Sequence, residues 1–574
     1  MSDRFRPLLR YLPYIGWALL LFEVLFWRLG VPTFWDPDEA HYAQTTRELI
    51  ASGDWLAPHY NQQPFFDKPV LFHLLQAVPV WLLGPTEFAA RLVPALASLA
   101  LILTTCWLGT ALCSVEVGLV AGLLLTVSPA VLALSRYAIL DTLFTAFLFA
   151  GAALVTVAAL RGPRRLQYAG YALIGLAALT KGPLAVMLCG IAFVISAAVS
   201  AETRKRLFAL RWVIGVALVL VIASPWFWYM WDRFGRAFIK GYLLDENVLL
   251  FSKPLYRGQP DWSFYLRIVA AGLVPWTGLL LGRLYDDLRG AFSGRRPDAF
   301  EVLLWSWTVA VVGFFSFSQF KLDHYIFPAA PSLCLLCARA WVGLDAPKPA
   351  SFTAGTRLGY RLIGPTLALV GVAAGALMMT RLAVPPAALV GPSVLAVVGA
   401  VLTVRSIGPD VTPRRAPWMA LGAIAVTYAT LMLGVLPVLE KQKVVPDLAR
   451  WVAGHASPAH RVAMYRMNRW SPAFRFYVGR HTIGVETPDE AARVFDEPGP
   501  FYCAMAERGY EELVARGVPL EIVYSRDGMW ATSGRALWRF RNPPTRFLIV
   551  TRAGKPPRSD PRSEERRVGK ECRL

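Results

Sequence analysis

The sequence has little charge for its length. Of 574 residues, 17% are charged and 55% are hydrophobic, and 39 acidic residues stand against 59 Lys and Arg. So little charge argues against a water-soluble enzyme and predicts an integral membrane protein. The formal net charge of +20 would suit nucleic acid, but the basic residues lie in short segments between apolar stretches. We therefore interpret the positive charge as a signal of membrane orientation and expect no nucleic-acid partner.

Cysteine is scarce as well. Five of the seven cysteines lie in or at the ends of apolar stretches, where a thiol behaves as a small hydrophobic group. Cys334 and Cys337 have C-x-x-C spacing but no other ligands nearby, so we predict neither a metal site nor a disulfide framework. The first apolar stretch is too long for a removable signal peptide and lacks a small-residue cleavage site. No internal repeat of fixed period is present.

Long apolar runs dominate the chain instead. Each is about 18 to 24 residues long, enough to cross roughly 30 Å of hydrocarbon. They predict an all-α polytopic membrane domain over residues 1–438, with about 13 transmembrane helices. The expected spans are 11–30, 88–110, 115–134, 141–160, 166–180, 183–200, 212–230, 262–282, 301–318, 325–343, 362–380, 383–404 and 416–438.

Lys and Arg concentrate in alternate segments between these spans, for example in 161–166 and 202–211. By the positive-inside rule the N-terminus is cytoplasmic and the region after the last span is outside. This predicts a multi-pass protein of the bacterial inner (plasma) membrane. Two outward loops are long, 31–87 and one near 231–261, and loops of that length are usually functional.

After the last span the composition changes. From Glu440 onward charge returns and the periodicity shortens, which predicts a small periplasmic α/β domain over 440–555. Residues 556–574 are expected to be a disordered tail, and 562–574 read like the in-frame translation of a sequencing adapter. The expected strands are 461–467, 474–478, 520–524, 536–540 and 547–550, and the expected helices are 446–455 and 510–516.

Two adjacent carboxylates, Asp38 and Glu39, begin a regular run that continues to Ile50. Acidic residues in a first helical turn are favoured by the helix dipole, so one interpretation is a capped amphipathic helix along the membrane. The other is catalytic, because transfer of a sugar to a hydroxyl requires that its proton be removed. The sequence alone does not separate the two.

Further polar residues fall on the outward side of the predicted membrane, where charge is costly to hold without a partner. Lys68 and Lys181 either extend to the membrane interface or bind a phosphate. Arg136 and Asp141 would pair across a short turn. Tyr325, which follows Lys321 at the start of a span, would be an interfacial aromatic residue or part of a binding cavity.

Taken in order, these residues resemble a known family. The first-loop motifs Asp38-Glu39, Gly53-Asp54-Trp55 and Phe66-Asp67-Lys68-Pro69 are similar to those of the lipid A aminoarabinose transferases. The same family resemblance includes the dolichyl-phosphate-mannose protein mannosyltransferases, and all are glycosyltransferases of the GT-C superfamily. Later motifs at 140–141, 179–182 and 321–325 also match. The resemblance covers the membrane region through about residue 343.

The resemblance implies a reaction. Such enzymes take a sugar from a polyprenyl phosphate and pass it to a glycolipid, glycan or protein acceptor with inversion at the anomeric carbon. Asp38 would be the leading catalytic carboxylate with Glu39 beside it, and Lys68 would contact the donor phosphate, whose developing charge needs cationic stabilisation. No covalently bound cofactor and no metal ligand are implied. The further substrate-binding residues would be His41, Tyr42, Asp67, Arg136, Asp141, Lys181, Glu246, Lys321 and Tyr325.

Three positions depart from the aminoarabinose transferase pattern. His41 stands where those enzymes typically have arginine, Asp67 where they have glutamate, and Asn247 where many have histidine. Each change touches a substrate pocket, so the sequence does not name the sugar or the acceptor. The main alternative is a transporter or flippase of lipid-linked sugars, which would show inverted repeats or broken helices; the sequence indicates neither, and its charges cluster at one face instead. A membrane scaffold would leave the charged outward residues unexplained.

Overall fold

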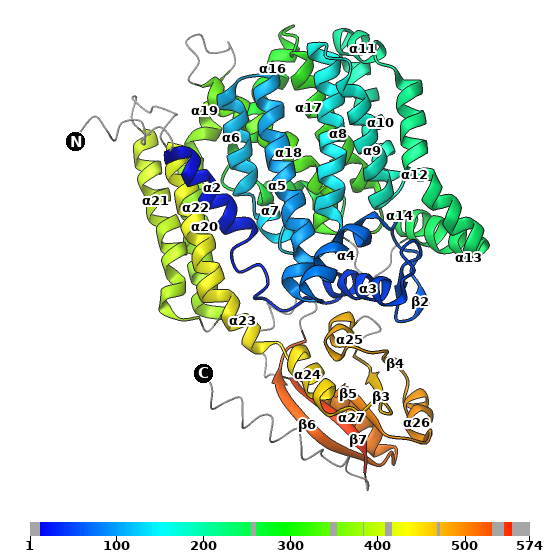
Figure 1. The fold of residues 1–574 in the computed structure, drawn as a ribbon. Coiled ribbons are helices and arrows are strands. Elements are labelled where there is room, and N and C mark those ends of the chain that lie inside the picture. The colour runs from blue at the N-terminus through cyan, green and yellow to red at the C-terminus, as the bar shows by residue number, and fades with distance from the viewer. Residues whose placement is uncertain are drawn as a thin grey trace, which may run out of the picture. The chain divides into compact units, whose positions relative to one another are not determined.

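The computed structural model describes residues 12–253, 260–344, 353–382, 384–407, 416–467, 471–530 and 545–553. The predicted tail at 556–574 and the predicted strand at 536–540 lie outside these residues. Contacts divide the chain into two compact units (Figure 1), which are described separately. The helical unit comprises Met1–Pro32, Leu49–Pro58 and Pro64–Leu436, and the mixed unit comprises Thr33–Glu48, His59–Gln63 and Pro437–Leu574.

The helical unit confirms the predominantly helical membrane fold. Within the described residues, eight helical segments are long and apolar enough to cross a membrane. These are Glu87–Leu112 (α5), Asp141–Arg161 (α8), Trp212–Phe234 (α12), Ala299–Phe317 (α17), Asp323–Gly343 (η3 and α18), Ala354–Arg381 (α19 and α20), Pro386–Ser406 (η4 and most of α21) and Trp418–Gln442 (most of α22, then η5 and α23).

Four other predicted spans coincide with helices shorter than a membrane is thick. They are α2 (Leu12–Leu25), α6 (Val115–Thr126), α9 (Leu166–Lys181) and α10 (Leu184–Val199). The predicted number of thirteen therefore stays a prediction. The remaining helices of this unit are α4 (Leu71–Leu83), α7 (Pro129–Leu134), α11 (Ala201–Phe208), α13 (Arg236–Phe238), η2 (Ile239–Leu249) and α14 (Leu250–Ser252).

One predicted span is broken. The apolar stretch 262–282 forms two helices, α15 (Phe264–Gly272) and α16 (Thr277–Phe292), which meet at 115°. Pro275 lies between them, and proline cannot donate the amide hydrogen bond that a continuing helix needs. The hydropathy of the stretch gave no sign of the bend, because both halves are apolar.

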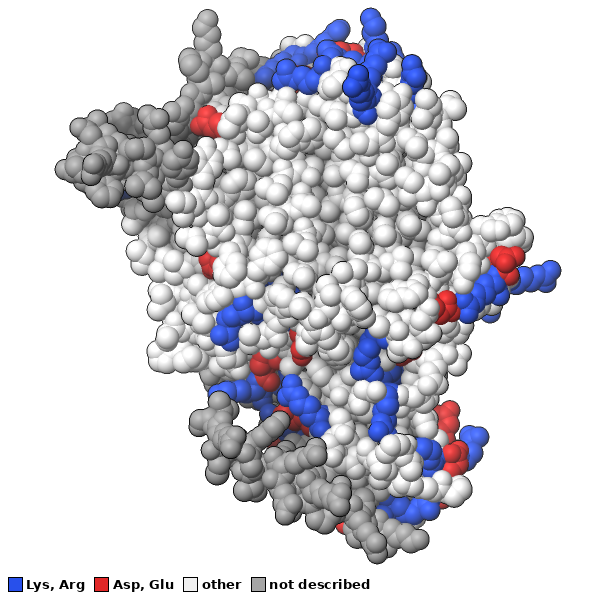
Figure 2. Space-filling model, in the orientation of Figure 1, with Lys and Arg blue, Asp and Glu red and all other residues white. Residues whose placement is uncertain are grey.

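Charge is distributed unevenly over the helical unit. On the face that Figure 2 shows, the middle of the helical unit is largely uncharged, and Lys and Arg gather at the end where Figure 1 places α11. Helix α11 carries Arg204, Lys205 and Arg206 in sequence. An uncharged belt with a basic end is the distribution that the positive-inside rule describes for a membrane protein.

The mixed unit is built on a five-stranded sheet in the order β4-β3-β5-β7-β6. Strand β3 pairs in parallel with β4 and β5, whereas β7 is antiparallel to both β5 and β6. Tyr465, Met505 and Leu548 are among the buried residues of its core. The strands are β3 (Arg461–Tyr465), β4 (Ile483–Val485), β5 (Phe501–Ala506), β6 (Leu520–Gly528) and β7 (Thr545–Arg552), and the helices are α24 (Val445–His455), α25 (Pro472–Val478), α26 (Pro488–Asp496) and α27 (Glu507–Ala515).

A segment of the predicted first loop belongs to this unit. Thr33 donates from its backbone amide and its hydroxyl to Glu440, and the Phe34 amide donates to the Tyr477 hydroxyl. Arg47, on α3 (Asp38–Ser52), donates to the Phe476 carbonyl. The loop also holds the short strands β1 (His59–Tyr60) and β2 (Gln63–Pro64).

One strand prediction in this region was wrong. Residues 474–478 are rich in aromatic side chains, which favours a strand, but they lie in the helix α25. Pro472 lies in the first turn of this helix, and Gly479 ends it in the left-handed conformation with φ of 79°. These helix start and stop signals outweighed the strand preference of five residues.

Candidate active site

Lys68 lies at the centre of a charged cluster in the helical unit. Its ammonium donates to the Glu246 carboxylate at 2.8 Å and to the Asp67 carbonyl at 2.9 Å. Burial opposes the charge on Lys68, but the Glu246 and Asp67 carboxylates together raise the pKa of the ammonium. Burial and the neighbouring Glu246 raise the pKa of Asp67 to about 6, although Lys68 acts in the opposite direction. Lys68 is therefore held charged and oriented.

Aromatic packing fixes both sides of this cluster. Phe66, next to Asp67, meets the rings of Phe234 and Phe238 at centroid distances of 5.2 and 5.7 Å. Phe238 in turn stacks on Tyr242 in η2, the π-helix that carries Glu246. The pairing of Lys68 with Glu246 thus depends on two segments that lie 178 positions apart.

A second ion pair joins Asp141 and Lys181 at 2.5 Å. The Lys181 ammonium also lies 4.9 Å from the centroid of the Tyr325 ring, a cation–π distance. His324 places a ring nitrogen 3.9 Å from Asp141. The structure therefore brings together three residues that the sequence predicted, and it adds His324. Asp141 is also among the charges that raise the pKa of Lys68, so the two ion pairs interact.

Gly182 explains why a tight turn follows Lys181. Helix α9 ends at Lys181, and Gly182 continues the chain with φ of 83°. A Cβ at this position would collide with the Tyr242 hydroxyl. Only glycine tolerates both the conformation and the close approach, so the Thr180-Lys181-Gly182 motif positions the Lys181 side chain.

Two predicted residues of this unit have structural partners. The Arg136 guanidinium donates to the carbonyls of Val24 and Trp27 at 3.1 and 2.7 Å, at the end of α2. These bonds satisfy carbonyls that a helix end leaves open, and Asp141 pairs with Lys181 instead of with Arg136. Lys321 donates to the Ser318 carbonyl just after α17.

The carboxylates Asp38 and Glu39 lie in the mixed unit, in the first turn of α3. The predicted helix start is thereby confirmed. Glu39 is fully buried and accepts a hydrogen bond from the Trp35 amide at 3.0 Å, which anchors the chain entering the helix. Asp38 is partly exposed. Of the two residues, Asp38 is therefore the more exposed.

His41 and Tyr42 follow on the same helix. The His41 ring lies 3.9 Å from the Tyr60 ring, measured between centroids, and 6.3 Å from that of Tyr42. Tyr60 in turn lies under the Arg475 guanidinium at 4.8 Å. This part of the predicted site is an aromatic and cationic group that α3 shares with β1 and α25.

Asp36 was not among the predicted catalytic or substrate-binding residues, yet it is a second buried carboxylate of the mixed unit. Its oxygens accept hydrogen bonds from the Ala473 amide at 2.8 Å and from the Trp530 indole at 3.2 Å. Burial raises the pKa of Asp36 to about 7, although these hydrogen bonds and the charges of Lys443 and Arg475 oppose the shift. Its partners lie more than 430 positions away, so only the acidic Asp36-Pro37-Asp38 pattern could have pointed to it.

The helical-unit cluster provides two ammonium groups, Lys68 and Lys181, each held by a carboxylate. Such an arrangement can bind a phosphate and stabilise the charge that develops when it leaves. In the described part of the chain, no three His, Cys, Asp or Glu residues are grouped in a way that could hold a metal ion.

Comparison with known proteins gives consistent similarities. Residues 15–238 match the family described as dolichyl-phosphate-mannose-protein mannosyltransferase. The undecaprenyl phosphate-alpha-4-amino-4-deoxy-L-arabinose arabinosyl transferase of Edwardsiella ictaluri is 31% identical over 331 residues, covering 56% of this chain and 59% of that protein. The corresponding transferase 1 of Proteus mirabilis is 31% identical over 388 residues, covering 63% and 65%.

A solved structure extends the similarity over nearly the whole fold. The crystal structure of ArnT from Cupriavidus metallidurans bound to undecaprenyl phosphate matches with a TM-score of 0.73 at 22% identity, covering 94% of this chain and 98% of that one. The sequence alignments with the aminoarabinose transferases of Edwardsiella ictaluri and Aeromonas salmonicida cover about three fifths of the length of those proteins. The chain therefore has the fold of ArnT and, as its first-loop motifs predicted, resembles the GT-C aminoarabinose and protein-mannose transferases.

Proposed function

We propose that this protein is an integral membrane glycosyltransferase that moves a sugar from a polyprenyl-phosphate donor to an acceptor on the periplasmic side. The observation that carries the proposal is the pair of ammonium groups, Lys68 and Lys181, each oriented by a carboxylate at 2.8 and 2.5 Å. The similarity to a structure that contains undecaprenyl phosphate supports it. The acceptor would be lipid A, another glycolipid or a protein.

Each residue has a proposed role. Lys68 would bind the donor phosphate on the side of its ammonium that faces away from Glu246, which holds the ammonium in place. Lys181, oriented by Asp141 and the Tyr325 ring, would stabilise the phosphate as it leaves. A phosphate leaving group needs little protonation, so no strong general acid is required.

Asp38 would be the catalytic carboxylate in this scheme. With a hydroxyl acceptor it would remove the proton, whereas with an acceptor that is already an anion, such as a lipid A phosphate, it would position the acceptor. Glu39 would instead support the start of α3, because its carboxylate already accepts the Trp35 amide. His41, Tyr42, Asp67, Arg136, Glu246 and Lys321 would complete the substrate-binding set.

We propose that the N-terminus is cytoplasmic and that residues 440–555 form a periplasmic domain. The basic segments between spans support this orientation, since α11 carries three consecutive basic residues. Cysteine labelling with a membrane-impermeant reagent tests it. A cysteine placed at exposed Glu521 should react in intact cells treated to permeabilise only the outer membrane, and one at Lys205 should not.

The activity test uses purified full-length protein in lipid nanodiscs with radiolabelled polyprenyl-phosphate sugars and envelope extract. Label should move to an acceptor, and Asp38→Ala and Lys68→Ala should abolish transfer while the protein still folds. Arg233→Ala is a matched control, because this exposed arginine pairs with Asp54 and belongs to no predicted site. The proposal is contradicted if the label stays on the donor whichever fraction of the envelope extract is added as acceptor.

A flippase of lipid-linked sugars remains the second candidate, and one observation favours it. Helices α15 and α16 meet at 115°, and broken helices are a feature of transporters. Reconstituted vesicles distinguish the two functions. Labelled donor that crosses the bilayer without an acceptor, and is never transferred, would establish the flippase.

A further inference from the structure

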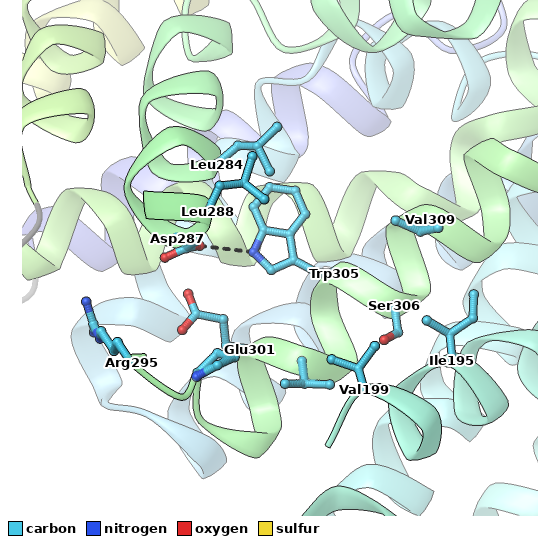
Figure 3. A pocket seen from close by; sticks show the side chains of 12 residues that line it. Ile195, Val199, Leu284, Asp287, Leu288, Arg295, Glu301, Trp305, Ser306 and Val309 are labelled. Atoms are coloured by element: carbon cyan, nitrogen blue, oxygen red, sulfur yellow. Dashed lines mark hydrogen bonds between the residues drawn. The ribbon is translucent and has the colours of Figure 1, made fainter. Parts of the chain in front are cut away.

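A separate cavity of about 280 Å³ lies within the helical unit (Figure 3), between α10, α16, the segment that follows α16, and the first half of α17. None of the residues predicted for the active site lines it. Eight of its twelve lining residues are apolar. The lining consists of Ile195, Val199, Leu284, Asp287, Leu288, Arg295, Pro297, Glu301, Val302, Trp305, Ser306 and Val309.

The cavity and the proposed active site lie at opposite ends of α17. Glu301 is in the first turn of this helix, whereas Lys321 and Tyr325 follow its last residue, Phe317. A helix of 19 residues is about 28 Å long at roughly 1.5 Å per residue, which is close to the thickness of the hydrocarbon layer. Helix α10, whose last turns line the cavity, leads into the basic helix α11.

At one end of the cavity, and apart from Arg295, two carboxylates share one guanidinium. Arg283 pairs with both Asp287 and Glu301, so a single guanidinium serves two carboxylates. Asp287 also accepts a hydrogen bond from the Trp305 indole at 3.1 Å. Arg339 does not restore the balance, because it forms its own ion pair with Asp298. The two carboxylates therefore leave room for one more cation.

At the same end, Arg295 has positive charge to offer. Arg295 is exposed, and its guanidinium makes no hydrogen bond or ion pair with another described residue, although its backbone amide donates to the Gly290 carbonyl. Figure 3 shows Arg295 beside Glu301, with Ile195, Val199 and Val309 along the other side of the cavity. A ligand that fits this lining has an ammonium for the carboxylates, an anionic oxygen for Arg295 and a hydrocarbon chain for the apolar wall.

We propose that this cavity binds a phospholipid with an ethanolamine headgroup, with one acyl chain against the apolar wall. The ammonium would donate to Asp287 and Glu301, and the phosphate would accept from Arg295. An ammonium offers three N–H donors to the carboxylates, whereas a trimethylated choline headgroup offers none. The cavity is near the lower end of the range for drug-sized ligands, about 300 to 1,000 Å³, which suits a single chain.

Native mass spectrometry of the delipidated full-length protein tests the proposal. The protein is mixed with phosphatidylethanolamine, phosphatidylcholine or phosphatidylglycerol carrying identical acyl chains. We expect one molecule of phosphatidylethanolamine to bind about tenfold more tightly than either of the others, the effect of one lost charge-assisted hydrogen bond. Equal binding of all three lipids would overturn the proposal.

Two pairs of variants locate the binding. Arg295→Ala should weaken phosphatidylethanolamine binding about tenfold, whereas Arg296→Ala, the adjacent exposed arginine that does not line the cavity, should not. Val309→Trp should fill the cavity and abolish binding, whereas Val213→Trp, on an exposed face of α12, should leave it intact. Neither pair touches the Arg283 ion pairs, so folding is preserved. The site is refuted if Arg295→Ala and Val309→Trp both still bind phosphatidylethanolamine more tightly than the other two lipids, because the lipid would then bind elsewhere.

Discussion

Replacing Lys68 with alanine is expected to weaken binding of undecaprenyl phosphate. In the structure the Lys68 ammonium is 2.8 Å from Glu246, and its side chain is 21% exposed, so it is oriented but still accessible. A hydrogen bond to a charged group contributes about 1.5 to 3 kcal/mol. Its loss should raise the Kd about 10- to 150-fold.

Glu246→Gln should have the opposite effect. A phosphate that binds Lys68 at a similar distance on the far side from Glu246 would lie about 6 Å from that carboxylate. Two unit charges at this separation repel by about 3 kcal/mol at an effective dielectric constant near 20. Because the Glu246 side chain is 25% exposed, water screens part of this repulsion, and we expect the Kd to fall about tenfold.

The assay is the thermal shift of each purified variant over a titration with undecaprenyl phosphate, since a ligand stabilises by RT ln(1 + [L]/Kd). Lys240→Ala is the matched control, because this exposed lysine lies on the same π-helix as Glu246. Unchanged affinity in Lys68→Ala would show that another group binds the phosphate. Equal weakening by Lys68→Ala and Glu246→Gln would show that the ion pair acts only in folding.

Three further predictions concern residues with structural partners. Burial raises the pKa of Asp36 to about 7, so the free energy of unfolding is highest below about pH 4 and falls as the pH rises to about 7. Asparagine does not ionise, so the free energy of unfolding of Asp36→Asn should rise by about 4 kcal/mol relative to wild type across this window. Hydrogen exchange of β5 and β7 measures this difference. Arg136→Ala removes two donations to carbonyls at the end of α2 and should cost about 1 to 3 kcal/mol, seen as a lower melting temperature. Glu39→Ala should lower the melting temperature more than Asp38→Ala does, because it leaves the Trp35 amide unbonded, whereas Asp38→Ala should lower transfer. The first expectation is contradicted if wild type and Asp36→Asn have identical pH profiles of stability. The second is contradicted if Arg136→Ala keeps the wild-type melting temperature, and the third if Glu39→Ala and Asp38→Ala lower it equally.

Hydropathy predicted the helical unit well where a span is one uninterrupted helix. Helices α5, α8 and α12 begin and end close to the predicted limits, because an apolar stretch in a membrane satisfies its backbone hydrogen bonds only within a helix. The bend between α15 and α16 was missed, since both sides of Pro275 are equally apolar. In the mixed unit, β3 and β7 were predicted, but the segment 474–478 was not recognised as a helix, because its local pattern was too short to decide.

The sequence by itself determined the membrane character of the protein, the helix start at Asp38 and the lysines of the candidate site. These follow from local composition, from the preference for acidic residues in a first helical turn and from motifs within a few residues. Only the tertiary structure decided which charges pair. Lys68 meets Glu246 across 178 positions and Lys181 meets Asp141 across 40. The cavity beside Glu301 forms where α10 lies against the consecutive helices α16 and α17. Such contacts depend on how helices pack, and a linear pattern of residues does not contain that information.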